Sequence, residues 1–257
     1  MNVLAILQAR VSSSRLPSKV LAPILGQAML TRQMERLRRA ETIDRLVIAT
    51  SDHATDDPLA ELCAGSGVAC HRGSLDDVLA RFSGAYVAFG PARHVVRLTG
   101  DCPLADPTVI DRVVRHHMAS GVDYTTNAVQ PTWPDGLDVE VMRSEVLQRA
   151  CAEARLPSER EHVTPYIHKH PEWFRVEHVR GERDLSMFRW TVDEPADLAF
   201  VTEVYQALYP QNPAFTTDDV LALLERRPEL AQINGNFLRN EGYAKSLAAD
   251  SPHSNQN

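Results

Sequence analysis

The stretch that decides the fold lies at the start of the chain and reads VLAILQARVSSSRLPSK over residues 3–19. Its first residues are apolar and are followed by polar and turn-forming ones, which is typical of a buried strand that ends in a loop. The loop combines Arg10, Arg15 and Lys19 with several serines. Guanidinium, ammonium and hydroxyl groups bind phosphate, so one hypothesis is a triphosphate clamp. On charge alone, an ordinary solvated basic loop is the commoner outcome.

The chain beyond this loop alternates short apolar runs with amphipathic segments. We predict strands at residues 45–50, 68–71 and 94–98, and helices at residues 28–40, 56–65, 76–89 and 106–119. Strands that alternate with helices at this spacing indicate βαβ units and a mostly parallel sheet. Right-handed crossovers then place every strand-to-helix loop at one edge of the sheet, where ligands bind.

The second half of the chain carries further patterns. Residues 137–141 alternate strictly between apolar and acidic, which predicts a strand with Asp138 and Glu140 on one face. A capping box at residues 158–161 predicts one helix that runs to about His168. Further helices are predicted at residues 144–155, 193–208 and 216–227, with a strand pair at residues 174–179 and 187–190. The polar end, residues 245–257, is expected to be disordered.

Length and composition limit the classes of protein to which this chain can belong. With 257 residues, of which 44% are hydrophobic and 24% charged, the chain suits one large α/β domain over residues 1–244. Its formal charge of −7 argues against broad binding to nucleic acid or to anionic membranes. No apolar run approaches the roughly 20 residues that cross a bilayer. The four cysteines form no CxxC pair and the chain opens on a strand, so we expect a cytoplasmic protein with reduced thiols.

Two carboxylates lie at the ends of predicted elements, where a ligand would bind. Asp101 comes directly after the strand at residues 94–98 and a glycine, and Asp193 opens a helix. Mg²⁺ bound to a triphosphate is held by one or two carboxylates, so these two would form a metal site if the sheet brings them together. Each aspartate, considered alone, also has a purely structural explanation. Asp101 would belong to a Gly-Asp turn, and Asp193 would cap the N-terminus of a helix.

Other familiar sites are missing from the sequence. It contains no GxxxxGK[ST] loop, no GxGxxG turn and no GxSxG elbow. The ten histidines show no HExxH or comparable spacing, so we interpret them as surface or capping residues. Trp133 and Trp190 border the proposed site and are interpreted as core or interface residues.

Five motifs, taken in order, resemble those of the cytidylyltransferases that activate acidic sugars, which include the CMP-sialic acid and CMP-Kdo synthetases. The motifs are ILQAR at residues 6–10 followed by Ser13, RLP at 15–17 and Lys19, RLTGDCPL at 97–104, PDGLDVE at 134–140, SEREHVTPY at 158–166 and RWTVDEP at 189–195. The resemblance covers roughly residues 1–210. It is closest to the branch that contains the spore coat polysaccharide biosynthesis protein SpsF.

The resemblance implies a fold, a substrate and a cofactor. The fold would be that of the nucleotide-diphospho-sugar transferases, a three-layer α/β/α sandwich around a mostly parallel sheet. CTP would be the substrate and Mg²⁺ the cofactor, with Asp101 and Asp193 as metal ligands. Arg15, Lys19 and Asp101 would act in catalysis by positioning and charge neutralisation. Nucleotide contacts are implied for Leu7, Ala9, Arg10, Ser13, Arg15, Lys19, Thr99 and Gly100.

The resemblance also implies an acceptor and an assembly. An acceptor hydroxyl would attack the α-phosphate of CTP in line, and pyrophosphate would leave. The expected contacts to an acidic sugar or related acid are Asp138, Glu140, Arg160 and His162, with Arg160 as a candidate for holding its carboxylate. Family members are commonly dimers, so we expect a homodimer with a dimerisation insertion within residues 127–165.

Two other functions stay open on sequence grounds. A glycosyltransferase that consumes a nucleotide sugar would share the fold, but such enzymes usually hold their metal with an Asp-x-Asp motif, which residues 101–103 do not match. A non-catalytic nucleotide-binding subunit is the second alternative, and the presence of Arg10, Arg15 and Lys19 with both aspartates speaks against it. The sequence does not select among sialic, legionaminic, pseudaminic and Kdo-type acceptors.

Overall fold

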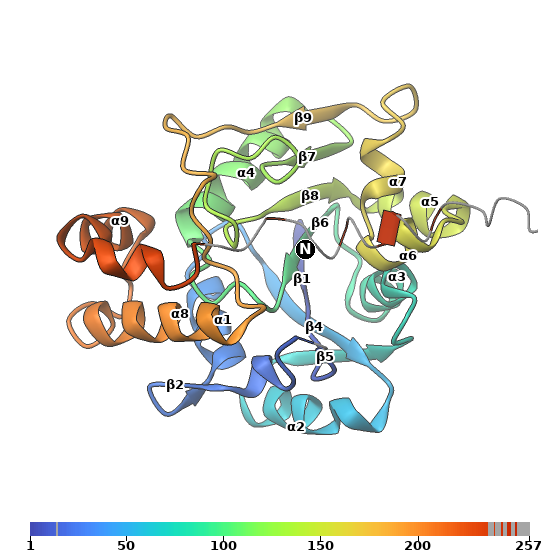
Figure 1. Ribbon diagram of the computed structural model, residues 1–257. Helices are drawn as coiled ribbons and strands as arrows, with labels where there is room; N and C mark the ends of the chain where they lie inside the picture. Colours follow the sequence, from blue (N-terminus) through green and yellow to red (C-terminus); the bar gives the residue numbers. More distant parts are fainter. Residues whose placement is uncertain (14, 236–238, 240–242, 244–245, 248–249, 251–257) are drawn as a thin grey trace, which may run out of the picture.

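The computed structural model describes residues 1–13, 15–235, 239, 243, 246–247 and 250, and these form a central sheet of seven strands in the order β5-β4-β1-β6-β8-β7-β9 (Figure 1). The strands are β1 Val3–Gln8, β4 Arg45–Ser51, β5 Ala69–Gly73, β6 His94–Thr99, β7 Tyr124–Thr126, β8 Glu140–Arg143 and β9 Val176–His178. Strands β1, β4, β5 and β6 are parallel, whereas β8 runs antiparallel to β6 and to β7. The predicted mostly parallel sheet is therefore confirmed.

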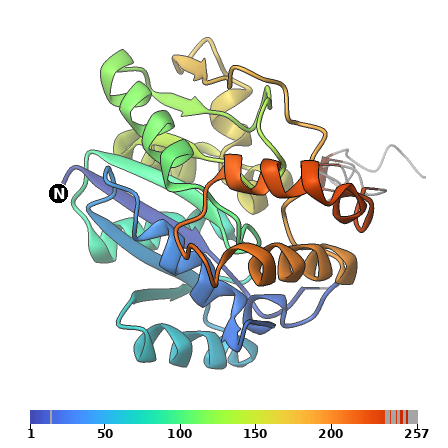
Figure 2. The ribbon, with the colours of Figure 1, turned by 90° about the vertical axis from the view of Figure 1, so that its left-hand side faces the viewer.

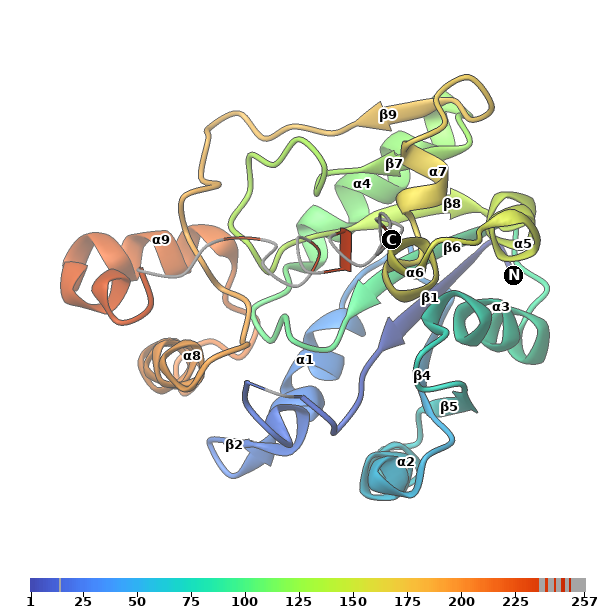
Figure 3. The same ribbon diagram turned by 45° about the vertical axis from the view of Figure 1, so that its right-hand side comes forward.

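Helices cover both faces of the sheet and complete the expected three layers (Figure 3). The first face, turned toward the viewer in Figure 2, packs against α1 Met29–Leu37, α2 Asp57–Gly65, α4 Pro107–Ser120, α8 Pro195–Leu208 and α9 Thr217–Arg226. The second face packs against α3 Val78–Phe89, α5 Ser144–Glu153, α6 Pro157–His162 and α7 Pro165–His168. Shorter elements are the 3₁₀ helices η1 Lys19–Leu21, η2 Ala54–Asp56 and η3 Pro228–Gln232, and the hairpin of β2 Pro23–Ile24 with β3 Gln27–Ala28.

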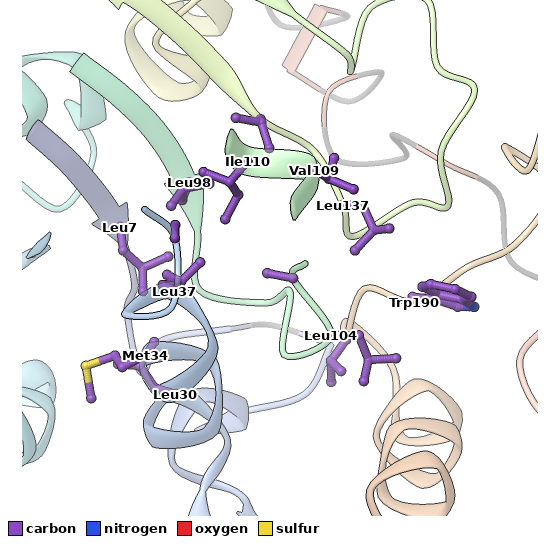
Figure 4. Packing of buried hydrophobic residues seen from close by; sticks show 14 of the residues in the cluster. Leu7, Leu30, Met34, Leu37, Leu98, Leu104, Val109, Ile110, Leu137 and Trp190 are labelled. Carbon is purple, nitrogen blue, oxygen red and sulfur yellow. The ribbon is translucent and has the colours of Figure 1, made fainter. Parts of the chain in front are cut away.

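The side chains of β1 alternate between the two layers of helices. Val3, Ala5 and Leu7 belong to the core on the first face, and Leu4 and Ile6 to the core on the second. A strand that is buried on both faces has an unbroken apolar sequence, which explains the run at the start of the chain. Figure 4 shows the first of these cores, where labelled side chains of β1, α1, β6 and α4 gather.

The chain changes direction across the sheet at β1. From β1 it moves outward through β4 to β5, and it then returns to the other side of β1 to form β6. Ligands of open α/β sheets bind at such a switch point, in the crevice outside the carboxyl ends of the strands. Because β8 runs the opposite way, its first residue, Glu140, lies at the same edge as the loops that follow β1 and β6.

The helix predicted to continue to His168 is in fact two helices. The first, α6, ends at His162, and α7 begins at Pro165. Proline has no N–H to donate and disfavours helical conformation in the residue before it. Val163 adopts a positive φ of 72°, which also interrupts the helix. The break lets Thr164 donate a hydrogen bond of 2.6 Å to Glu140.

The predicted strand pair at residues 174–179 and 187–190 is also wrong. Only the first segment forms a strand, β9, and it pairs in parallel with β7. The second makes an isolated bridge between Arg189 and Asp135. The guanidinium of Arg189 is held by surrounding carboxylates, among them Asp197 at 2.9 Å, which fixes this segment beside the switch point instead of beside β9.

Three smaller expectations meet the structure as follows. Trp133 and Trp190 are buried in the core, as interpreted from the sequence. His117, expected at the surface or at a cap, is fully buried because it lies on the core side of α4, where it contacts Thr125 at 2.9 Å. Residues 127–165 contain β8 and α5, which contribute to this chain's own core, and α6, which packs against α3.

The polar end of the chain is described only in part. Of residues 245–257, predicted to be disordered, residues 246, 247 and 250 are helical, and the others lie outside the described residues. Ser246 contacts His162 at 2.9 Å, and Asp250 accepts the Ser158 amide at 2.9 Å. Within the described part of the chain, no helix combines the length and the apolar character needed to cross a bilayer.

Candidate active site

A cleft of about 1120 Å³ lies outside the edge of the sheet where β1, β6 and β8 present their loops. This exceeds the roughly 300–1,000 Å³ of a typical small-molecule pocket, so it has room for a nucleotide and a second substrate. Leu7 does not line it, because its side chain is fully buried in the core and Gln8 lines the cleft instead. The predicted residues that do line it are Ala9, Arg10, Ser13, Arg15, Lys19, Thr99, Gly100, Asp101, Asp138, Glu140, Arg160, His162 and Asp193.

The cleft has two halves. We call the side formed by residues 8–10, 13, 15, 19, 99–101 and 193 the nucleotide half, after the ligand that the sequence analysis predicts for it. We call the side beyond β6, formed by Arg97 and by residues 138–140 and 157–168, the acceptor half, after the second predicted ligand. Sequence segments far apart in the chain therefore line one cavity.

The basic loop of the nucleotide half is folded into a compact turn. The amides of Ser13 and Ser18 both donate to the carbonyl of Val11, at 2.9 and 3.0 Å. Val11 in turn donates its amide to Asp56 at 2.6 Å. Ser18 has a positive φ of 60° and leads into η1, where Lys19 is buried. The interpretation as an ordinary solvated loop is therefore wrong for Lys19.

Lys19 lies between the two aspartates that were predicted as metal ligands. Its Nζ is 2.8 Å from Asp193 Oδ1 and 3.4 Å from Asp101 Oδ2, and it donates to the carbonyl of Val192 at 2.7 Å. Burial lowers the pKa of Lys19, but the two aspartates outweigh burial and leave that pKa above its usual value. Burial raises the pKa of Asp101, yet Lys19 and hydrogen bonds outweigh it and leave that pKa lowered. Both groups are therefore charged at neutral pH.

Asp193 is contacted by further cations. Its Oδ2 is 3.0 Å from Nη2 of Arg15 and 3.2 Å from Nη2 of Arg189. The helix-cap explanation for Asp193 is wrong, because α8 is capped by a box made of Glu194 and Asp197. Asp197 accepts the amides of both Asp193 and Glu194, each at 2.9 Å. The carboxylate of Asp193 is thus left to face the cleft.

A glycine brings the loop after β6 against the loop after β1. A Cβ built on Gly100 would lie 2.8 Å from the Cβ of Ala9 and 2.9 Å from the carbonyl oxygen of Gln8, which is closer than packing allows. The Gly100 amide donates to the same carbonyl at 2.7 Å. A larger residue here would push Asp101 away from the basic loop.

The two carboxylates of the nucleotide half suit a divalent cation. One ammonium group contacts both, so they converge on a position of the size of one cation. Among the described residues, no cluster of three or more His, Cys, Asp and Glu side chains could hold a metal alone. Mg²⁺ commonly takes one or two carboxylates together with phosphate oxygens and water, so Asp101 and Asp193 fit an ion that is shared with a triphosphate.

The acids of the acceptor half follow the predicted alternation, although β8 begins only at Glu140. Glu140 is buried and accepts hydrogen bonds from Arg97, Tyr124 and Thr164. Asp138 is paired with Arg239, and burial raises the pKa of Asp138 to about 7. The carboxylates of Glu140 and Asp138 are therefore each paired with an arginine of this chain.

The two basic residues predicted for the acceptor half lie on α6. Arg160 donates from both Nε, at 3.0 Å, and Nη2 to Asp77, and from Nη1 to the carbonyl of Cys151 at 2.7 Å. His162 contacts Ser246, and burial lowers the pKa of its ring. Both side chains line the cleft, but these contacts direct their polar groups toward other protein groups and not into the open space of the cleft.

Several residues that line the cleft were not predicted from the sequence. Arg81, Arg97 and Arg189 line the cleft, as do residues 75–78. The available signal was an arginine flanked on both sides by apolar residues within a predicted element. Arg97 interrupts a β strand in this way, and Arg81 does the same in α3.

A mostly parallel sheet with cations and paired carboxylates at its switch-point crevice is typical of α/β proteins that bind phosphorylated ligands. Comparison with known proteins refines this class. The model of the Cytidylyltransferase family matches residues 4–231. This chain belongs to that family and is a nucleotidyltransferase, as its motifs indicated.

Individual relatives agree with this assignment. The spore coat polysaccharide biosynthesis protein SpsF of Bacillus subtilis is 35% identical over 239 residues, which cover 90% of this chain and 97% of SpsF. The mitochondrial 3-deoxy-manno-octulosonate cytidylyltransferase of Arabidopsis thaliana is 33% identical over 161 residues, 59% of this chain and 52% of that protein. A solved cytidylyltransferase structure from Leptospira borgpetersenii superposes with a TM-score of 0.86 at 30% identity, covering 93% of this chain and 100% of the other.

Proposed function

We propose that this chain transfers the cytidylyl group of CTP to a hydroxyl group of an acidic sugar, with Mg²⁺ as cofactor, in the synthesis of a surface polysaccharide or glycan. The observation that carries the proposal is the convergence of Arg15 and Lys19 with Asp101 and Asp193 at the switch point. The names of SpsF and of the 3-deoxy-manno-octulosonate enzyme support the acceptor class and the biosynthetic setting.

In the proposed reaction, the acceptor oxygen attacks the α-phosphorus of CTP. The bond from that phosphorus to the oxygen of the β-phosphate breaks, pyrophosphate leaves, and the hydroxyl proton passes to solvent. Arg15 and Lys19 hold the phosphates and neutralise the charge that develops on them. Mg²⁺, held by Asp101 and Asp193 together with phosphate oxygens, would add to this neutralisation.

The ion pairs of the nucleotide half would have to exchange partners for this reaction. In the structure, Lys19 and Arg15 are bound to the same aspartates that would hold the metal. Triphosphate oxygens would take over the two cations, and the metal would take over the two carboxylates. We therefore expect CTP to bind much more weakly in EDTA than with Mg²⁺, as measured by isothermal titration.

The test of the function is pyrophosphate release. The purified chain is incubated with Mg²⁺, each of the four nucleoside triphosphates, and a panel of sugar acids that includes 3-deoxy-manno-octulosonate and N-acetylneuraminate. We expect release with CTP and at least one acid. A glycosyltransferase would instead release a nucleoside diphosphate from a nucleotide sugar, and a non-catalytic subunit would bind CTP and release no pyrophosphate with any acid.

We propose in addition that the chain is a cytoplasmic homodimer in which a segment within residues 127–165 reaches toward the partner. The support for this is the resemblance in the motifs at residues 134–140 and 158–166. Light scattering of the purified chain should give twice the mass of 28.6 kDa. A mass of one chain at the concentrations of the assay would contradict the dimer.

A further inference from the structure

The arginines of the acceptor half differ in how far their donors are used. Arg160, the residue that the sequence suggested for an acceptor carboxylate, already donates from three nitrogens to Asp77 and a main-chain carbonyl. Arg239 is paired with Asp138 and also donates to a carbonyl. Of the five N–H groups of a guanidinium, Arg160 uses three and Arg239 uses two, and Arg239 is not among the described residues that line the cleft.

Arg97 has donors to spare. Among the described residues, its hydrogen-bond partner is Glu140, which receives Nη1. Its Nε is buried and has no hydrogen-bond partner in the part of the chain that the structure describes. The side chain lines the cleft and is 14% exposed, so part of it is accessible from the cleft. A planar guanidinium with one edge anchored can bind a carboxylate with the nitrogens that remain.

The position of Arg97 in the sheet is unusual for a charged residue. It lies on the face of β6 that carries Val95, and it pairs in register with Glu140 of β8. Its neighbours on that face, Met142 and Tyr124, are fully buried. Taking a charge pair out of water is unfavourable compared with packing apolar residues, so such a pair at the floor of a cleft indicates a role other than stability.

Glu140 fixes Arg97 and has little capacity left for a ligand. One of its carboxylate oxygens accepts from both Tyr124 and Thr164, and the other accepts from Arg97. These donors come from β6, from β7 and from the break between α6 and α7. Glu140 is thus suited to be a positioning residue, rather than the direct acceptor contact that the sequence suggested.

The surroundings of Arg97 connect it with both halves of the cleft. The residue pairs in register with Glu140 of the acceptor half, and it lies in β6, whose following loop carries Asp101 of the nucleotide half. His162, His168 and Asp101 line the same cleft as Arg97. An acid held by Arg97 would therefore lie where the two halves meet.

We propose that Arg97 binds the carboxylate of the acceptor acid, and that Glu140, with Tyr124 and Thr164, holds the guanidinium in place for it. This inference rests on the proposed function, which supplies an acidic acceptor. It replaces Arg160 with Arg97 as the residue that selects acids over neutral sugars.

The test compares Arg97→Met with Arg160→Gln, using the acid that the wild-type chain turns over fastest. Since a charge-assisted pair is lost, Arg97→Met should raise KM for the acid by about ten- to a hundredfold and leave KM for CTP nearly unchanged. Arg97→Lys should recover part of this loss. The wild-type chain should prefer the acid to its methyl ester, and Arg97→Met should lose that preference.

A second variant protects the test against misfolding. Removing Arg97 alone leaves Glu140 buried and unpaired, so the double variant Arg97→Met/Glu140→Gln removes both charges together. It should fold, bind CTP and show the same loss for the acid. An unchanged KM for the acid in this variant, or loss of the acid preference in Arg160→Gln instead, would overturn the assignment.

Direct binding separates this inference from the proposed function. If the wild-type chain binds CTP but releases no pyrophosphate with any acid, the proposed function fails. Titration of 3-deoxy-manno-octulosonate and N-acetylneuraminate into the wild-type and double-variant chains then judges Arg97 by itself. Binding that needs Arg97 supports the site, and equal binding by both chains, or binding by neither, overturns it.

Discussion

The nucleotide half and the acceptor half of the cleft both contain paired charges, but they hold them differently. In the nucleotide half, Arg15 and Lys19 contact aspartates that face the cleft, so a bound nucleotide and metal can take over both partners. In the acceptor half, Glu140 is 6% exposed and is bound from three sides inside the core. We therefore expect burial of the partner, more than the type of charge, to determine whether an ion pair can exchange.

The largest expected effect concerns the buried pair. Glu140→Ala leaves the donors of Arg97, Tyr124 and Thr164 without their acceptor, which should lower the free energy of unfolding by about 3–5 kcal/mol. Urea denaturation measures this loss. Glu41→Ala is the matched control, because it breaks an exposed pair with Arg115 and should cost at most about 1 kcal/mol. Equal losses in the two variants would show that the two kinds of pair do not differ.

The second effect concerns the metal ligands proposed for the nucleotide half. Asp101→Asn removes one carboxylate charge, and pyrophosphate release at saturating Mg²⁺ should fall by about a hundredfold or more. The fold should survive, because Lys19 keeps its contacts with Asp193 and the carbonyl of Val192. Asp184→Asn, which changes an aspartate outside the cleft, should keep the wild-type rate. An active Asp101→Asn chain would remove Asp101 from the site.

The third effect concerns the exchangeable cations. Lys19→Ala should weaken CTP binding by about 1.5–3 kcal/mol, the range of a charge-assisted phosphate contact, and Arg15→Ala by a similar or smaller amount. Isothermal titration with Mg²⁺ present measures both. Arg115→Ala lies outside the cleft and serves as control. CTP affinity that is unchanged in both cleft variants would contradict the phosphate clamp.

The smallest effect is on the pH dependence of stability, which should have opposite signs in the two halves. The pKa of Asp101 is lowered in the folded chain, so its contribution is present at neutral pH and is lost as the pH falls through the acid range. Burial raises the pKa of Asp138 from 3.8 to about 7, so its contribution is present at acid pH and is lost as the pH rises toward 7.

Urea denaturation between pH 4 and 7 should measure the contribution of Asp138 separately from that of Asp101. Asp138→Asn should gain stability relative to the wild type across this range, by about 1–2 kcal/mol after allowance for screening at a side chain that is 28% exposed. A difference between wild type and variant that does not change with pH would contradict the raised pKa of Asp138.

Much of the nucleotide half could be predicted from the sequence, because its signals are local. The apolar run before Gln8 predicts a strand buried on both faces, and the runs at residues 45–50 and 94–98 predict its two neighbours. Parallel strands place the residues that follow them at one edge. Arg15, Lys19 and Asp101 were therefore expected together before any contact between them was known.

The acceptor half was harder to predict, because its contacts join segments that are distant in the chain. Asp138 meets Arg239, 101 residues away, and Glu140 meets Arg97 across a register that the alternation at residues 137–141 does not specify. The helix break at Val163 and Pro165 brings Thr164 to the same carboxylate. Periodicity predicted which face Glu140 is on and could not predict what lies opposite.

The sequence was thus sufficient for the class of fold and for the order of the larger elements in the first half of the chain, and it placed the charges of the first loop at the edge of the sheet. Periodicity and turn residues indicate the conformation of residues that are close together in the sequence, and the motifs indicate the family. The burial of Lys19 between two aspartates and the anchoring of Arg97 by Glu140 followed only from the packed structure. Strand order and register bring those groups together, and the pattern within any one segment carries no information about its partner.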